Sequence, residues 1–207
     1  VALKNDGTIW SWGQNSSGQL GDQSKTNRSS PVQEQSGSTD WIAISGGSAH
    51  TLALKSDKSL WAWGGNPWGS LGSGDTSVGE DRNVPTLIHS ENIWESISAD
   101  NHSMAIKSDG SLWGWGFNSK GQLGNGQTSD RGSPTRIGSE NNWLKVYAGG
   151  YHTLALKEID KTMILFSVSG GALSIWAIRP DGSDLVQLSE GYGGTWKPDS
   201  SEFAYVK

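Results

Sequence analysis

The sequence predicts an all-β fold, a β-propeller built of four-stranded blades, and three observations support this fold class. Similar segments begin at Ala2, Ala53 and Ala105, so the chain of 207 residues repeats with a period of about 51 residues. A fixed period of about 20–50 residues indicates a repeat architecture. Within each repeat, apolar residues alternate with small or polar ones, as is typical of strands. The 29 glycines and 12 tryptophans disfavour long helices.

Each repeat offers about four short strands, the content of one propeller blade. A predicted strand such as Leu52–Lys55 is followed by a tight turn and a second strand, Leu60–Trp63. The turn contains Asp6-Gly7 in the first repeat and Asp109-Gly110 in the third, where glycine supplies the positive φ that a tight hairpin needs. The second repeat has Asp57-Lys58 instead, so we expect its turn to differ or to be strained.

Two loops and a further strand complete the repeat. A glycine-rich loop, Gly-x-Asn-x-x-Gly-x-Leu-Gly, spans residues 13–21, 64–72 and 116–124, and a variable loop follows it. The next predicted strand begins at Trp41 in the first repeat and leads to His50. We expect Trp10, Trp12, Trp41 and their equivalents to fill the space between neighbouring blades.

Composition and charge limit the function classes. The formal net charge of −5, with basic residues scattered singly, gives no positive surface for nucleic acid. The longest apolar run, Met163–Phe166, is far shorter than the roughly 20 residues of a membrane span, so we expect no membrane insertion. The absence of cysteine excludes disulfides and zinc–thiolate sites, and no motif indicates a cofactor.

The repeated residues carry a family pattern over residues 1–157. The pattern is A-L-K-x-D-G-x-L-W-x-W-G-x-N-x-x-G-Q-L-G, followed by W-x-x-I-x-x-G-x-x-H-T. It resembles the regulator of chromosome condensation repeat, which implies a seven-bladed propeller. Three repeats of about 51 residues and the start of a fourth, at Ala155, predict an incomplete propeller or a fragment of a larger ring. Repeats rich in Trp, Gly and Asn and free of cysteine resemble those of bacterial, exported members.

The pattern changes at Glu158. Residues 163–207 contain Ile175-Trp-Ala-Ile178, Pro180-Asp-Gly182 and Trp196-Lys-Pro-Asp199. These motifs resemble the TolB-like propeller repeat, although Ser200 stands where that pattern has glycine. The resemblance implies a further blade over residues 158–207.

The sequence shows no catalytic set, and we expect no enzyme activity. His50, His102 and His152 occupy the same position in successive repeats, which indicates one structural hydrogen bond per blade rather than a metal site. The acidic residues Asp75, Glu80 and Asp81 do not have the spacing of a calcium loop.

The loops carry the candidate binding residues, because loops on a rigid scaffold are where binding function usually lies. Trp68 stands where the other repeats have Ser17 and Lys120, so blade packing does not call for it. The candidate binding residues are Trp68, Asn66, Asp75, Arg82, Asn118 and Lys120.

We therefore predict a non-catalytic module that recognises a protein or glycan through these loops, in an exported or cell-surface protein. Two alternatives stay open. One is an assembly subunit that self-associates through open blade edges, which promote association. The other is an accessory propeller of a hydrolase or lyase.

Overall fold

The computed structural model describes residues 1–74, 80–91 and 93–158, and the backbone of strands at residues 164–169, 173–178 and 186–189. The chain divides into two compact units, Val1–Lys157 and Glu158–Lys207. The described residues are strands and loops, apart from one short 3-10 helix, so the predicted all-β class is confirmed. None of them forms a helix with the length and hydropathy that crossing a membrane requires.

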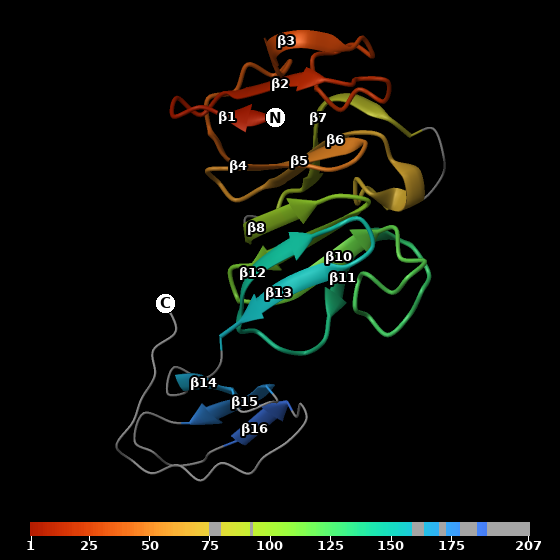
Figure 1. Cartoon of the computed structure of the whole chain (residues 1–207). Helices are drawn as coiled ribbons and strands as arrows, with labels where there is room; N and C mark the ends of the chain where they lie inside the picture. Colours follow the sequence, from red (N-terminus) through yellow and green to blue (C-terminus); the bar gives the residue numbers. More distant parts are fainter. Residues whose placement is uncertain (75–79, 92, 159–163, 170–172, 179–185, 190–207) are drawn as a thin grey trace. The chain divides into compact units, whose positions relative to one another are not determined.

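The first unit consists of successive antiparallel sheets (Figure 1). The first sheet has the order β1 (Ala2–Leu3), β2 (Ile9–Gly13), β3 (Arg28–Gln33). The second, here called blade 2, is β4 (Trp41–Gly46), β5 (His50–Lys55), β6 (Leu60–Gly64), β7 (Arg82–His89). The third, blade 3, is β8 (Trp94–Ala99), β9 (His102–Lys107), β10 (Leu112–Gly116), β11 (Arg131–Ile137). A two-stranded sheet follows, β12 (Trp143–Ala148) and β13 (Thr153–Lys157).

The second unit contains one sheet with the order β14 (Ile164–Ser169), β15 (Leu173–Ile178), β16 (Val186–Ser189). Its strands are antiparallel. The Pro-Asp-Gly and Trp-Lys-Pro-Asp motifs lie outside the described residues.

The blades are offset from the sequence repeats, which corrects the expectation that one repeat forms one blade. The repeat that begins at Ala53 supplies strands β5, β6 and β7 of blade 2 and then the first strand of blade 3. Each repeat therefore ties two neighbouring blades together.

The core lies between the sheets, where each blade packs its apolar face on the next. Leu52, Leu54 and Leu60 of blade 2 meet Trp94 and Trp115 of blade 3. Ile9 of the first sheet meets Trp41 and Trp63 of blade 2. Trp41, Trp63, Trp94 and Trp115 are at most 2% exposed, as expected for residues between blades.

Trp12 departs from this pattern. It is the equivalent of Trp63 and Trp115, yet it is 48% exposed. The described residues provide no sheet on the outer side of the first sheet, so the expectation that Trp12 is a core residue is wrong for this structure.

The strained turn predicted in the second repeat is confirmed. Gly7 and Gly110 have φ of 76°, and Lys58 at the same position has φ of 64°. A Cβ at Gly7 would lie 2.0 Å from the carbonyl oxygen of Thr39, so glycine is needed in that turn.

Candidate functional site

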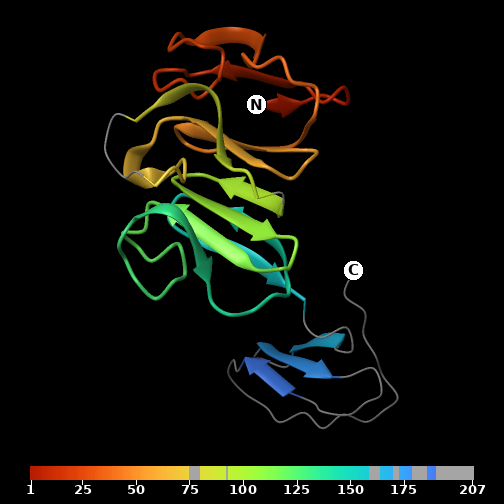
Figure 2. The same ribbon diagram turned by 180° about the vertical axis from the view of Figure 1, so that it is seen from behind.

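The long loops that follow β2, β6 and β10 lie along one end of the blades, as Figure 2 shows from behind. Each loop is held by one asparagine. The Oδ1 atom of Asn66 accepts a hydrogen bond from the Leu71 backbone N–H at 2.9 Å, and Oδ1 of Asn118 accepts one from Leu123 N–H at 3.0 Å. Asn15 does the same for Leu20.

Two of the predicted binding residues, Asn66 and Asn118, are therefore internal supports. Both side chains are fully buried. The Nδ2 group of Asn118 also donates to the carbonyl oxygens of Gln127 and Ser129, at 2.9 and 3.0 Å. Buried polar groups take partners within the protein, so these amides hold the loops and do not face a ligand.

Trp68 lies on this end of the molecule in the 3-10 helix η1 (Pro67–Gly69). Its backbone has φ of 60° and ψ of 15°, the left-handed region that a bulky residue rarely adopts. The side chain is 40% exposed, and its ring centroid lies 4.5 Å from that of Phe117 in the next blade. Strained backbone is concentrated at functional sites, which makes Trp68 a strong candidate for one.

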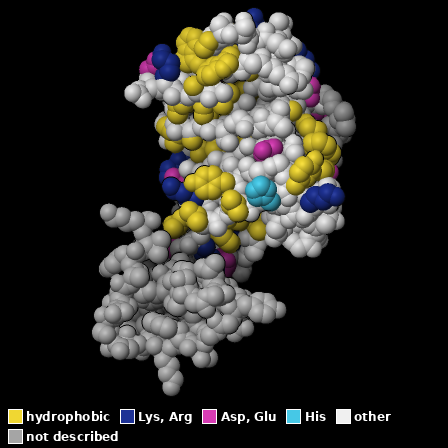
Figure 3. All heavy atoms as spheres, viewed as in Figure 1, with side chains coloured by type: hydrophobic (Ala, Val, Ile, Leu, Met, Phe, Trp, Pro, Cys, Tyr) yellow, Lys and Arg dark blue, Asp and Glu magenta, His cyan; other side chains and the backbone are white. Residues whose placement is uncertain are grey.

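The stacking continues to the following blade. The Phe117 ring lies 6.0 Å from the ring of Tyr151, which is 61% exposed in the turn between β12 and β13. Trp68, Phe117 and Tyr151, here called the aromatic row, therefore connect three successive sheets. Figure 3 shows hydrophobic side chains gathered beside a basic one on this side of the molecule.

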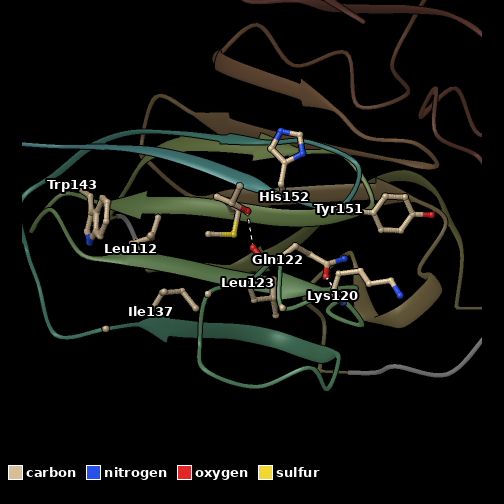
Figure 4. Close-up of a pocket in the computed structure, with 13 residues that line it drawn as sticks. Leu112, Lys120, Gln122, Leu123, Ile137, Trp143, Tyr151 and His152 are labelled. Atoms are coloured by element: carbon tan, nitrogen blue, oxygen red, sulfur yellow. Dashed lines mark hydrogen bonds between the residues drawn. The ribbon is translucent and has the colours of Figure 1, made fainter. Parts of the chain in front are cut away.

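Lys120 is a predicted binding residue close to Tyr151 of this row. Its side chain is exposed, and it lines the same cavity as Tyr151 (Figure 4). No ion pair to Lys120 is found among the described residues. The row thus presents two exposed rings, Trp68 and Tyr151, near a lysine that has no ion-pair partner among the described residues.

The remaining predicted residues are Arg82 and Asp75. Arg82 is half-buried at the start of β7, and Asp75 lies outside the described residues. Asp81 is paired with Lys25 of the preceding loop, with 2.9 Å between Oδ2 and Nζ. Within the part of the chain that the structure describes, no three His, Asp or Glu side chains are grouped to hold a metal.

Two of the three histidines, His50 and His102, make the structural hydrogen bonds expected of them, whereas the side chain of His152 is exposed. Nε2 of His50 lies 2.8 Å from Oγ of Ser103, and Nε2 of His102 lies 2.7 Å from Oγ1 of Thr153. Each bond joins one blade to the next. Burial lowers the pKa of His50 to about 4 and, together with a smaller effect from His152, that of His102 to about 4.

The sequence analysis did not identify Phe117 and Tyr151. The signal that marked Trp68 also marks Phe117, because the other repeats have Gln14 and Gly65 at its position. Tyr151 likewise replaces Ala49 and Asn101.

Comparison with protein families gives one match. The profile described as "Regulator of chromosome condensation (RCC1) repeat" matches residues 6–54, 57–106 and 109–156, which together make up more than half of the chain. The matches end before the residues for which a TolB-like repeat was expected, and that expectation stays a prediction.

Curated relatives show the same repeats. The chain is 32% identical over 181 residues to the Ultraviolet-B receptor UVR8 of Arabidopsis thaliana, covering 84% of this chain and 40% of the receptor. It is 30% identical over 121 residues to the Regulator of chromosome condensation of Mus musculus, covering 56% of this chain and 28% of that protein. The chain thus spans less than half the length of these relatives.

Solved structures share the fold. Human WBSCR16 matches with a TM-score of 0.65 at 22% identity, over 84% of this chain and 44% of that one. Prp20p of Saccharomyces cerevisiae matches with a TM-score of 0.65 at 24% identity, over 85% of this chain and 42% of that one. The blades described above therefore have the same fold as blades of these larger propellers, of which the chain covers less than half.

Proposed function

Since this chain belongs to the regulator of chromosome condensation (RCC1) repeat family, we propose that it is a non-catalytic module that binds another protein through the loop end of its blades. The observation that carries the proposal is the aromatic row. Tryptophan and tyrosine are enriched among the residues that carry most of the binding energy at protein–protein interfaces. The strained backbone of Trp68 holds one such anchor at the surface.

Related solved structures support a protein ligand. Prp20p of Saccharomyces cerevisiae has binding properties toward Gsp1p and histones, and Kap60 is bound to yeast RCC1 (Prp20) in another structure. These are the partners of Prp20p. For this chain they support only the proposal that the ligand is a protein.

The chemistry of the row favours an extended apolar segment over a sugar. A sugar site needs polar side chains directed at hydroxyl groups beside a flat ring. Here the amides of Asn66 and Asn118 are buried within the loops, and the rings are tilted by 39° and 68° to one another. Aromatic side chains of this kind line the surfaces on which proline-rich segments dock in known recognition domains. Lys120 favours an acidic residue next to them.

Selection of peptides from a random display library tests the proposal, with the full chain immobilised. We expect enrichment of apolar, proline-containing peptides with a neighbouring acidic residue. Substitution of Trp68→Ala or Phe117→Ala should weaken the selected peptide at least about 10-fold, as for anchor residues elsewhere. Leu87→Ala is the matched control, because Leu87 is 45% exposed on β7 and lies outside the row.

Two results would contradict this function. Peptides that bind the Trp68→Ala variant as well as the wild type would remove the row from the site. A glycan array in which a sugar binds through Trp68, with no peptide enriched, would replace the protein ligand by a glycan.

We also propose a further blade in the second unit and an exported or cell-surface location. A TolB-like blade over residues 163–207 is supported by the motifs quoted above and by the antiparallel order of β14, β15 and β16. An exported or cell-surface location is supported by the resemblance of these cysteine-free repeats to bacterial, exported ones.

A further inference from the structure

The first and third repeats place different side chains at one position after the glycine-rich loop. Asp22 directly follows the loop in the first repeat, and Asn125 directly follows it in the third. Arg28 and Arg131 are also equivalent, because each is paired with the glycine that ends the preceding strand of its sheet. The two repeats therefore combine the same arginine with a carboxylate in one case and an amide in the other.

In the first repeat the carboxylate serves donors with both of its oxygens. Oδ1 of Asp22 accepts a hydrogen bond from Nδ2 of Asn15 at 3.0 Å, and Oδ2 accepts one from Nε of Arg28 at 2.7 Å. A second nitrogen of the Arg28 guanidinium lies 2.7 Å from Oδ2, and the Asp22 side chain is only 6% exposed. Asp22 thus ties the loop to strand β3.

In the third repeat the amide serves donors with one atom only. Oδ1 of Asn125 accepts hydrogen bonds from Nδ2 of Asn118 at 3.3 Å and from the backbone N–H of Gln127 at 3.0 Å. Nδ2 of Asn125 and Nε of Arg131 are buried, and neither has a hydrogen-bond partner among the residues that the structure describes. These are the equivalents of the two atoms that bond in the first repeat. An amide has a single acceptor atom, so turning it over would serve Arg131 and leave the other donors unpaired.

The residue after Asn125 makes its amide chemically labile. Gly126 follows it, and this is the one asparagine–glycine pair in the chain. The backbone nitrogen after an asparagine can attack the side-chain carbonyl carbon, and glycine has no side chain to obstruct the approach. The nitrogen loses its proton to solvent, its bond to Cγ forms, the bond from Cγ to Nδ2 breaks, and ammonia leaves. Water then opens the succinimide at Cγ to give aspartate, or at the main-chain carbonyl to give isoaspartate.

The contacts of Asn125 favour this reaction. Its two donors, Nδ2 of Asn118 and the N–H of Gln127, are bonded to the oxygen on which negative charge develops as the nitrogen attacks. Donors placed at such an oxygen stabilise the developing charge. The leaving group, Nδ2, has no partner among the described residues that would hold it in place.

We propose that Asn125 is a site of spontaneous deamidation, and that the aspartate formed there pairs with Arg131 as Asp22 pairs with Arg28. The reaction consumes one water and releases one ammonia, with no oxidation or reduction. The carboxylate keeps an acceptor for the donors that Oδ1 already serves, and it supplies a second acceptor to the guanidinium. The product therefore ties the third loop to β11 as the first loop is tied to β3.

Ageing the full chain in mildly alkaline buffer, followed by digestion and mass spectrometry, tests the reaction. Asn125 is the only asparagine of the tryptic peptide that spans residues 121–131. We expect this peptide to gain the mass difference between an amide and a carboxylic acid before any other asparagine in the chain is converted. Fragmentation of the peptide assigns the change to Asn125.

Gly126→Gln is the matched control for the reaction. Gln23 occupies the same position in the first repeat with φ of 63°, close to the 74° of Gly126, so the backbone accepts glutamine there. The variant should lose the Asn125 amide several-fold more slowly than the wild type. Faster conversion of another asparagine, or an unchanged rate in Gly126→Gln, would overturn the proposed site.

Urea titrations of freshly purified variants test the pair with Arg131. Asn125→Asp should raise the folding equilibrium constant at least about 5-fold, because a charged hydrogen bond replaces two unpaired buried donors. Asp22→Asn is the reverse change in the first repeat and should lower the constant by a similar factor. In an Arg131→Gln background, Asn125→Asp should bring no gain. A variant Asn125→Asp that is no more stable than the wild type, or that gains as much without Arg131, would refute the pair.

Deamidation at Asn125 is independent of peptide binding at the aromatic row. Both experiments are read without a ligand, and the selection of peptides does not require the modified residue. A negative result in one therefore leaves the other standing.

Discussion

The imidazole of His50 donates a hydrogen bond to the hydroxyl of Ser103 in the next blade, with 2.8 Å between Nε2 and Oγ. The direction follows from Ser103, whose hydroxyl donates its proton to the carbonyl oxygen of Ser70 at 2.8 Å. A hydroxyl has one proton to donate, so the neutral imidazole must carry its proton on Nε2. His102 and Thr153 repeat the arrangement in the following blade.

The buried histidines that make these hydrogen bonds, His50 and His102, make the unfolding free energy depend on pH. Burial lowers the pKa of His50 and of His102 to about 4, from an ordinary value of 6.5. Because the folded pKa lies below the unfolded one, the proton binds more tightly to the unfolded chain. The unfolding free energy is thus highest above about pH 6.5 and decreases as the pH falls toward about 4, by up to about 3 kcal/mol per histidine. Urea titrations followed by tryptophan fluorescence measure this.

The charged neighbours of these histidines do not change the sign. His102 further lowers the pKa of His50, and His152 further lowers that of His102, where the carboxylate of Asp100 only partly opposes the effect of burial. His50→Gln keeps a donor but does not titrate, so its pH dependence should be flatter. If the unfolding free energy of this variant depends on pH as steeply as that of the wild type, His50 is ruled out as a source of the pH dependence.

A second prediction concerns the strained turn of blade 2. Lys58 has φ of 64°, where the other repeats have glycine, and a left-handed backbone costs a non-glycine residue about 1–2 kcal/mol. Lys58 also pairs with Glu95, but both side chains are largely exposed, and such a pair contributes little. We expect Lys58→Gly to raise the unfolding free energy by about 1 kcal/mol in a urea titration.

The reverse change is the control. At Gly110 a Cβ would lie 2.1 Å from the carbonyl oxygen of Asn141, so Gly110→Lys requires the backbone to move. Gly110→Lys should lower the unfolding free energy by more than Lys58→Gly raises it. Equal stabilities of the two variants would refute the assignment of strain to this position.

A third prediction concerns Lys107, whose ammonium group lies over two tryptophan rings. Nζ is 3.9 Å from the ring centroid of Trp113 and 4.8 Å from that of Trp94, and the side chain is only 12% exposed. Lys107→Met removes the charge and keeps the stem. We expect it to cost about 1–2 kcal/mol in chemical denaturation, which is the value of a partly desolvated cation–π contact.

Glu91 provides the control for Lys107. Its carboxylate lies 3.2 Å from Nζ and is 61% exposed, so Glu91→Gln should cost less than about 1 kcal/mol. If Glu91→Gln costs as much as Lys107→Met, the ion pair and not the rings stabilises this corner of the blade.

The sequence predicts the strands and the turns because their signals are local. The alternation of apolar and polar residues in a strand and the Asp-Gly pair of a turn can each be recognised within a few residues. The departure at Lys58 can be recognised in the sequence for the same reason. The point at which one blade ends and the next begins is not encoded in a local stretch of sequence. It depends on which strands share hydrogen bonds, and the repeat offers the same four strands in any cyclic order.

The candidate site is only partly predictable for a similar reason. Trp68 departs from the repeat and lies at the surface, as expected. Asn66 and Asn118 look like exposed loop residues in the sequence, but buried loop N–H groups require acceptors, and these amides supply them. The contact between Lys107 and its tryptophans joins three strands, so no single segment of sequence reveals it.

The last prediction separates the role of Trp68 from that of a core tryptophan. Trp68→Gly relieves the positive φ and loses the contact with Phe117, two effects of about 1 kcal/mol each with opposite sign. We expect its unfolding free energy to stay within about 1 kcal/mol of the wild type, whereas Trp115→Ala, at a fully buried position, should lose about 3–5 kcal/mol. Urea titrations of both variants measure the difference. A loss at Trp68 as large as that at Trp115 would mean that the fold requires this ring, and its exposed, strained position could then no longer be attributed to binding.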